Sequence, residues 1–144
     1  MQLSGDVASP VEVAARDAPT LYRYREELRA RFGYPDLHDG QSRVLTALNS
    51  TDVLGVMPTG SGKSLCYVLP ALAHGRTLVV SPLIALMQDQ VEALQAVGMP
   101  ATFINSQLDR HEKNRRYMDF VEGRVPLLYM APEQFQNATL VAGL

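Results

Sequence analysis

The stretch Met57-Pro58-Thr59-Gly60-Ser61-Gly62-Lys63-Ser64 decides how the rest of the chain is interpreted. An apolar run, Asp52-Val53-Leu54-Gly55-Val56, precedes it, and a second, Leu65-Cys66-Tyr67-Val68-Leu69, follows it. A strand, a glycine-rich loop and a helix in this order are typical of a phosphate-binding loop. We therefore predict a strand over 52–56, a phosphate loop over 57–64 and a helix that begins near Gly62.

The residue types of this loop suit the phosphates of a nucleotide. Gly60 and Gly62 let backbone N–H groups turn toward one anion, and the start of the helix adds unpaired N–H groups and the positive end of its dipole. The Lys63 ammonium can reach the β- and γ-phosphates, and the Ser64 hydroxyl can ligate Mg²⁺. The strict pattern has glycine where this chain has Met57. A flexible turn with a surface lysine is the alternative, which the two apolar runs disfavour.

Length and composition favour one globular domain in the cytoplasm. A chain of 144 residues can bury a core. No apolar run approaches the ~18 residues that span a membrane, and the first ten residues lack the features of a signal peptide. The single cysteine, Cys66, excludes an internal disulfide and is expected in the core. A formal net charge of −2 argues against a strongly basic nucleic-acid module but allows a local basic patch.

The residues before the loop predict a leader and two helices. Residues 1–18 show no periodicity, and we expect a flexible leader followed by one domain over 19–144. Apolar residues at helical spacing predict a helix over 19–32 that ends at Gly33. The arginines at 23, 25, 29 and 31 favour a solvated face over a DNA patch. A second helix should run to Asn49 with Val44, Leu45 and Leu48 pointing inward.

After the loop, strands and helices alternate. We expect strands at 76–81, 101–104 and 125–130, helices at 82–97 and 109–121, and a turn or helix from 131. Ser81 is the expected N-cap and Pro82 the expected N1 residue of the first of these helices. Repeated strand–helix units predict an α/β fold with a parallel sheet and helices on both faces. The phosphate loop, Ser81-Pro82 and Asn105-Ser106 should share the rim at the carboxyl ends of the strands.

Four motifs in this order resemble the N-terminal part of RecQ-type ATP-dependent DNA helicases, within the superfamily of DEAD/DEAH-related helicases. The phosphate loop, with Met57 in first position, looks like the first helicase motif of that family. Residues 32–41 look like its upstream adenine-recognition motif. Residues 80–91 look like its next motif, on the path of single-stranded DNA, and residues 128–133 are similar to the segment that ends its fourth strand. The resemblance covers about residues 20–135.

The resemblance implies an incomplete RecA-like P-loop NTPase domain that binds ATP and Mg²⁺. Paired with a second RecA-like domain, such a domain moves 3′ to 5′ along DNA. The implied phosphate and Mg²⁺ ligands are Thr59, Gly60, Ser61, Gly62, Lys63 and Ser64, with Lys63 and Ser64 in catalytic roles. Tyr34, His38 and Gln41 would lie at the adenine, and Ser81, Pro82 and Asn105 would lie near the DNA backbone.

Two departures from the family pattern limit what is expected of the chain. Leu37 and His38 stand where the family usually has phenylalanine and arginine, which puts adenine affinity in doubt. No Asp-Glu-Ala-His sequence follows Glu133, and residues 134–144 contain no acidic residue. That motif would supply a Mg²⁺ anchor and a general base. We therefore expect the isolated chain to bind nucleotide without efficient hydrolysis or DNA unwinding.

Other interpretations stay open. The chain could be a truncated, non-catalytic nucleotide-binding fragment, or another P-loop enzyme such as a small-molecule kinase, although no arginine-bearing lid can be placed. Glu133 is the single candidate for a substitute base, and a carboxylate near the start of a helix is the simpler interpretation. The segment from Arg110 to Arg116 mixes charges, which favours a solvated helix over a basic DNA patch.

Overall fold

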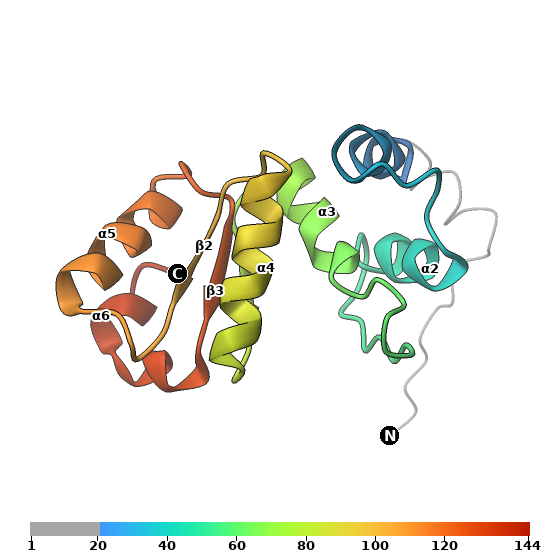
Figure 1. Ribbon diagram of the computed structural model, residues 1–144. Coiled ribbons are helices and arrows are strands. Elements are labelled where there is room, and N and C mark those ends of the chain that lie inside the picture. The colour runs from blue at the N-terminus through green and yellow to red at the C-terminus, as the bar shows by residue number, and fades with distance from the viewer. Residues whose placement is uncertain (1–20) are drawn as a thin grey trace, which may run out of the picture. The chain divides into compact units, whose positions relative to one another are not determined.

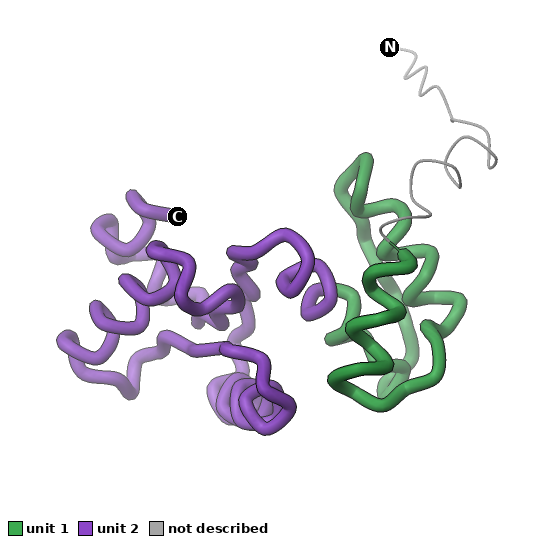
Figure 2. The backbone as a smooth tube through the Cα atoms, turned by 90° about the horizontal axis from the view of Figure 1, so that it is seen from above, with its two compact units in different colours: residues 1–66 green, residues 67–144 purple. Residues whose placement is uncertain are grey.

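The computed structural model describes residues 21–144 (Figure 1), so the predicted leader over 1–18 lies outside the described residues. The chain divides into two compact units, Met1–Cys66 and Tyr67–Leu144 (Figure 2). Each unit is described by itself below. The expectation of a single domain over 19–144 stays a prediction.

The first unit contains the two predicted helices. Residues 21–27 are α-helical and continue into a π-helical turn, η1 (Leu28–Phe32). Gly33 ends this helix with a φ of 70°, the left-handed conformation expected of a residue at C′. The second helix, α2 (Asp39–Ala47), buries Leu45 completely. Leu48 follows α2 and is 44% exposed, so the prediction that it points inward was wrong.

The strand predicted over 52–56 does not form. The segment has no secondary structure, and Leu54 and Val56 are 91% and 88% exposed. A strand is stable only when its backbone groups pair with a neighbouring strand, and no described segment pairs with these residues. The prediction of a strand here was therefore wrong, because the described residues offer no neighbouring strand to pair with this apolar segment.

The second unit is a three-layer α/β structure. Its elements follow in the order α3 (Leu65–His74, which begins at the end of the first unit), β1 (Thr77–Val80), α4 (Ile84–Ala96), β2 (Ala101–Ile104), α5 (Arg110–Val121), β3 (Leu127–Met130), η2 (Pro132–Gln136) and α6 (Ala138–Val141). The strands and helices predicted after the phosphate loop are thus confirmed, with ends that differ by at most three residues. Gly98, with a φ of 75°, follows the end of α4 as expected.

The sheet is parallel, as predicted, with the strand order β1-β3-β2. Thr77 and Ala101 both lie opposite Leu127, so β3 is paired on both sides. The ladder continues beyond the strands, because the N–H of Ser81 donates to Met130 O at 3.1 Å and that of Ala131 to Ile104 O at 3.1 Å. The loops after all three strands therefore lie at one rim of this sheet.

Helices cover both faces of the sheet (Figure 1). Successive residues of a strand point to opposite faces, and all four residues of β3 are buried. Leu128 and Met130 of β3 belong to a buried cluster with one residue of β2, two of α5 and one of α6: Ile104, Tyr117, Phe120 and Leu140. On α4, which contacts β2, Met87, Val91 and Leu94 are buried.

Candidate nucleotide-binding site

The phosphate loop has a backbone that presents free N–H groups. Gly60 and Gly62 have φ values of 77° and 74°, which side-chain-bearing residues rarely adopt. Ser61 N–H donates to Pro58 O at 3.2 Å and closes a tight turn. The N–H groups of Gly62, Lys63 and Ser64 donate to no acceptor among residues 21–144. Consecutive unpaired N–H groups after a left-handed glycine form a nest that attracts an anion.

The helix after the loop begins later than the sequence indicated. We predicted a start near Gly62, whereas α3 begins at Leu65. The positive φ of Gly62 is incompatible with a right-handed helix, and single turns join the loop to α3 through Leu65 N–Gly62 O and Cys66 N–Lys63 O bonds of 3.2 and 3.0 Å. This later start leaves the N–H groups of Lys63 and Ser64 outside the helical hydrogen-bond ladder.

The polar side chains of the loop are available for a ligand. Lys63 Nζ donates to the carbonyl oxygens of Met57 and Pro58, at 2.9 and 3.3 Å. These acceptors are neutral, and Lys63 has no carboxylate partner among the described residues, so its charge is not neutralised. Ser61 Oγ is buried without a hydrogen-bond partner. Free N–H groups, an unneutralised ammonium and an orphaned hydroxyl together fit a phosphate group.

The Ser64 hydroxyl is the candidate Mg²⁺ ligand on this loop. Its side chain is half-buried and makes no hydrogen bond in the described part of the chain. Residues 21–144 hold no cluster of three or more His, Cys, Asp or Glu side chains suited to a metal ion. A cation at Ser64 would therefore take most of its ligands from phosphate oxygens and water, as Mg²⁺ commonly does. Thr59 lies exposed at the tip of the loop.

Gln41 connects α2 to the phosphate loop. Its side chain is 2% exposed, its Nε2 donates to Gly62 O at 2.9 Å, and its Oε1 accepts from the His38 N–H at 2.8 Å. Both polar atoms thus have partners within the protein, and the residue braces the loop. The sequence pointed to Gln41 for its match to adenine and missed this bracing role. Contacts of Gln41 and His38 with adenine stay predictions.

The segment from Tyr34 to His38 is held by arginines of the preceding helix. Arg25 Nε contacts Asp36 Oδ1 at 2.7 Å, and this bond is the main cause of a lowered pKa of the Asp36 carboxyl. Arg29 Nε donates to Pro35 O at 2.7 Å. These two arginines therefore position the segment that carries Tyr34, whose ring is 56% exposed. Helical spacing alone gave no signal for this role.

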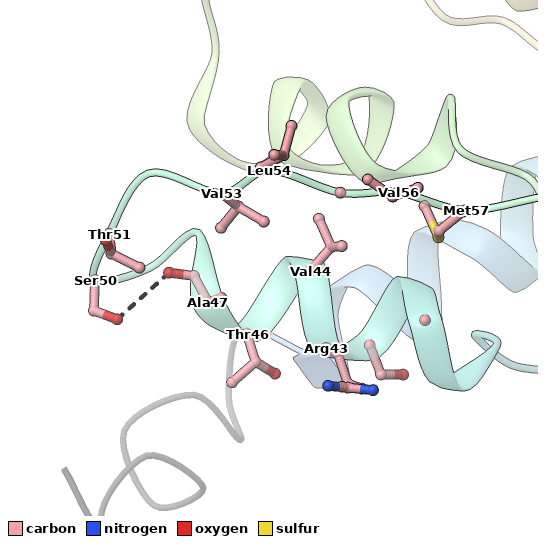
Figure 3. A pocket seen from close by; sticks show the side chains of 13 residues that line it. Arg43, Val44, Thr46, Ala47, Ser50, Thr51, Val53, Leu54, Val56 and Met57 are labelled. Atoms are coloured by element: carbon pink, nitrogen blue, oxygen red, sulfur yellow. Dashed lines mark hydrogen bonds between the residues drawn. The ribbon is translucent and has the colours of Figure 1, made fainter. Parts of the chain in front are cut away.

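A hollow of about 710 Å³ lies between α2 and residues 51–57 and reaches Met57, the first residue of the phosphate loop (Figure 3). Val44 of α2 points toward this segment and Arg43 points away from it. The walls include Val53, Leu54 and Val56, the apolar residues of the strand that does not form. None of Gly60 to Ser64 lines the hollow, so it is separate from the nucleotide site.

The residues expected near DNA lie at the rim of the sheet in the second unit. We predicted that α4 would begin at Ser81-Pro82, but it begins at Ile84. Ser81 Oγ instead accepts from the Leu83 N–H at 3.3 Å and forms a turn before the helix, in which Pro82 is exposed. Asn105 follows β2 and is fully buried, so its side chain is not displayed at the surface.

Asn105 supports its loop from the inside. Its Oδ1 accepts from the Gln107 N–H at 3.0 Å, and its Nδ2 is buried without a partner. DNA contacts at Ser81, Pro82 and Asn105 stay predictions, and for Asn105 the exposed neighbour Ser106 is the residue that the loop displays. Glu133 lies in the first turn of η2, where the simpler interpretation placed it.

Cys66 is 8% exposed, and burial raises the pKa of its thiol, so it is a core residue as expected. Burial, with a hydrogen bond from Tyr129 to the hydroxyl of Tyr67 at 3.4 Å, also raises the pKa of Tyr129. Both groups stay protonated at neutral pH and are structural.

No helix in the described part of the chain has the length and apolar character needed to cross a membrane.

Residues 38–142 match the DEAD/DEAH box helicase family, and the chain belongs to it. The match begins just before Gln41 and includes the phosphate loop and the whole three-stranded sheet. The resemblance to helicases that the motifs indicated is therefore confirmed, and the parallel α/β fold is that of a partial RecA-like helicase domain.

Within that family the chain is similar to RecQ-type proteins. It is 44% identical over 126 residues to the ATP-dependent DNA helicase RecQ of Haemophilus influenzae, which covers 82% of this chain and 20% of the relative. It is 42% identical over 139 residues to RecQ of Pasteurella multocida, covering 95% of this chain and 22% of the relative. The ATP-dependent helicase SGS1 of Saccharomyces cerevisiae is 36% identical over 138 residues, which are 89% of this chain and 10% of that protein. The chain thus spans about a fifth or less of these curated relatives.

Proposed function

We propose that this chain is the nucleotide-binding part of a RecQ-like motor, and that it binds Mg-ATP through the phosphate loop. The observation that carries the proposal is the nest of unpaired N–H groups at Gly62, Lys63 and Ser64 beside the Lys63 ammonium. Charge-assisted bonds to an anion would satisfy all of these donors at once. Membership of a helicase family supports ATP as the nucleotide.

In this proposal each residue of the site has a defined task. The N–H groups of residues 62–64 and the Lys63 ammonium hold the phosphates, and the Ser64 hydroxyl orients Mg²⁺, which neutralises charge on the phosphate oxygens when bound. Gln41 fixes the loop against α2. Tyr34 offers an exposed ring on which adenine can stack.

The relatives are named as ATP-dependent DNA helicases, and this supports DNA as the partner. We propose that 3′–5′ unwinding is carried out with a second RecA-like domain, in the cytoplasm. The isolated 144-residue chain is expected to bind nucleotide with little turnover. Steady-state release of phosphate by the pure chain, with and without single-stranded DNA, tests this last point, and DNA-stimulated turnover would contradict it.

Thermal unfolding with and without Mg-ATP tests the nucleotide site. A ligand at 100 times its Kd stabilises the folded state by roughly 2.7 kcal/mol, which corresponds to a rise in Tm of several degrees at about 2–4 °C per kcal/mol. Lys63→Ala should abolish the rise while the melt without nucleotide stays cooperative, because Lys63 is exposed. Equal shifts in the parent chain and in Lys63→Ala would show that ATP binds elsewhere.

A further inference from the structure

A second hollow, of about 670 Å³, lies in the second unit between the first turn of α5 and α6. Three basic residues of α5, Arg110, His111 and Lys113, line it. The other lining residues are polar, apart from one leucine: Asn114, Asn137, Thr139 and Leu140. Asn137 Oδ1 accepts from the Thr139 N–H at 3.1 Å, which leaves its amide nitrogen as a donor. The hollow therefore presents donors and positive charge.

The basic residues of this hollow differ from those on the rest of α5 and just after it. Arg115 and Arg116 contact Glu112 at 2.6 and 2.7 Å, and Arg124 contacts Asp119 at 2.8 Å. Arg116 also lies 4.4 Å from the centre of the Phe103 ring. The charges of these arginines are therefore already paired within the protein.

The side chains of Arg110, His111 and Lys113, by contrast, have no ion-pair or hydrogen-bond partner within residues 21–144. Of the two carboxylates adjacent to them in sequence, Glu112 is paired with Arg115 and Arg116, and Asp109 caps α5 by accepting from the Glu112 N–H at 2.8 Å. The segment that mixes charges in the sequence is thus divided by the structure into a paired half and an unpaired half.

These unpaired basic side chains also lie in the first turn of α5, the end of a helix where positive charge is unfavourable. The first turn of a helix carries the positive end of its dipole, which favours anions and disfavours cations. Of the two carboxylates at the start of α5, Glu112 is paired with Arg115 and Arg116, which leaves Asp109 to offset Arg110 and Lys113. Unfavourable charge around a polar hollow is resolved when an anion enters it.

We infer that this hollow, lined by Arg110, His111 and Lys113 of α5 and by Asn137, the N-cap residue of α6, binds backbone phosphates of a DNA strand. DNA is chosen as the source of phosphate because of the proposed motor function, on which this inference rests. The contact is independent of base sequence, because guanidinium, ammonium and amide donors recognise phosphate oxygens and not bases. The site lies outside Ser81, Pro82 and Asn105, the residues that the sequence suggested for DNA.

The test measures binding of the full 144-residue chain to a fluorescently labelled oligothymidylate by anisotropy, over a series of salt concentrations. Each single-strand phosphate contact contributes roughly 0.7 to the slope of log K against log salt. The variant Arg110→Ala/Lys113→Ala should therefore lower the slope by about 1.4 and the affinity at 0.1 M salt by roughly 25-fold. The control Arg115→Ala/Arg124→Ala removes the same charge from the same region, but from arginines that have carboxylate partners.

The control should retain most of the affinity. Equal losses in the two double variants, or no binding by the parent chain, would overturn the inference. Thermal unfolding in 10 mM inorganic phosphate at matched ionic strength distinguishes DNA from free phosphate as the ligand of the hollow. If phosphate stabilises the chain through Arg110 and Lys113 but the chain does not bind DNA, the hollow is a site for free phosphate and the DNA assignment is contradicted. The Mg-ATP shift of Arg110→Ala/Lys113→Ala should match that of the parent chain. If the parent chain binds DNA through these residues but its Tm does not rise with Mg-ATP, the proposed nucleotide site is contradicted while the proposed DNA site in the hollow is supported.

Discussion

Replacing either glycine of the phosphate loop with alanine separates backbone strain from the bracing role of Gln41. Gly60 and Gly62 have nearly the same φ, 77° and 74°. Alanine at either position should therefore cost about 1–2 kcal/mol from the left-handed conformation alone. A Cβ at Gly60 would meet no atom within 4 Å, whereas one at Gly62 would lie 2.5 Å from Gln41 Nε2.

The additional cost at Gly62 follows from the burial of Gln41. The Gln41 side chain is 2% exposed and must move to admit a Cβ, which breaks its bond to Gly62 O. A lost hydrogen bond costs about 0.5–1.5 kcal/mol, and a displaced polar group that stays buried costs more. We expect Gly62→Ala to lower the free energy of unfolding by about 1–2 kcal/mol more than Gly60→Ala does.

Urea unfolding of the two single variants, repeated in a Gln41→Ala background, measures this difference. With Gln41 truncated, the two glycine substitutions should have equal cost, because only the strain remains. The reasoning is refuted if Gly60→Ala and Gly62→Ala are equally destabilising in the parent chain, or if the difference between them persists without the glutamine side chain.

Three further predictions concern other residues. The pKa of Glu112 is lowered from 4.5 to about 2, mainly by its hydrogen bond to Arg115. The stability that this carboxylate contributes is therefore complete above about pH 4.5 and is lost as the pH falls toward 2. In the Glu112→Gln variant, the free energy of unfolding should depend less on pH within this window. Tyr117→Phe should leave the Tm unchanged or raise it, because the Tyr117 hydroxyl is buried without a partner. The same substitution should restore the stability lost in Gly143→Ala, because the added Cβ would collide with that hydroxyl. Tyr34→Ala should leave stability within about 0.5 kcal/mol but weaken binding of ATP relative to inorganic triphosphate in calorimetry, and equal weakening of both would argue against stacking.

Local signals in the sequence predicted the elements that depend on local interactions. Gly33 and Gly98 end helices because only glycine readily adopts their φ values of 70° and 75°. Asp109 was placed at the start of a charged helix, and its side chain caps α5. The β-branched and apolar runs that became β1 and β2 find partners in β3 among the described residues.

Errors arose where the outcome depends on distant residues or on backbone detail. Residues 52–56 have the composition of a buried strand, but composition cannot supply the neighbouring strand that would hydrogen-bond to them. The phosphate loop was found from its spacing alone, whereas the bond from Gln41 to Gly62 joins residues 21 positions apart and has no local signature. Helix α4 begins at Ile84 and not at the predicted Pro82, because the Ser81 hydroxyl closes a turn instead of capping the helix.

The strand order has a consequence for how the protein folds as it is synthesised. β1 and β2 are made first, yet they do not pair with each other, and each waits for β3, which lies between them. Thr77 meets its partner Leu127 only after 50 further positions have been added. At about 5–20 residues per second, the apolar strand β1 stays unpaired for several seconds on the ribosome. Helices α4 and α5 can form during this interval because their hydrogen bonds are local, so the nascent chain should present helices before it has a sheet.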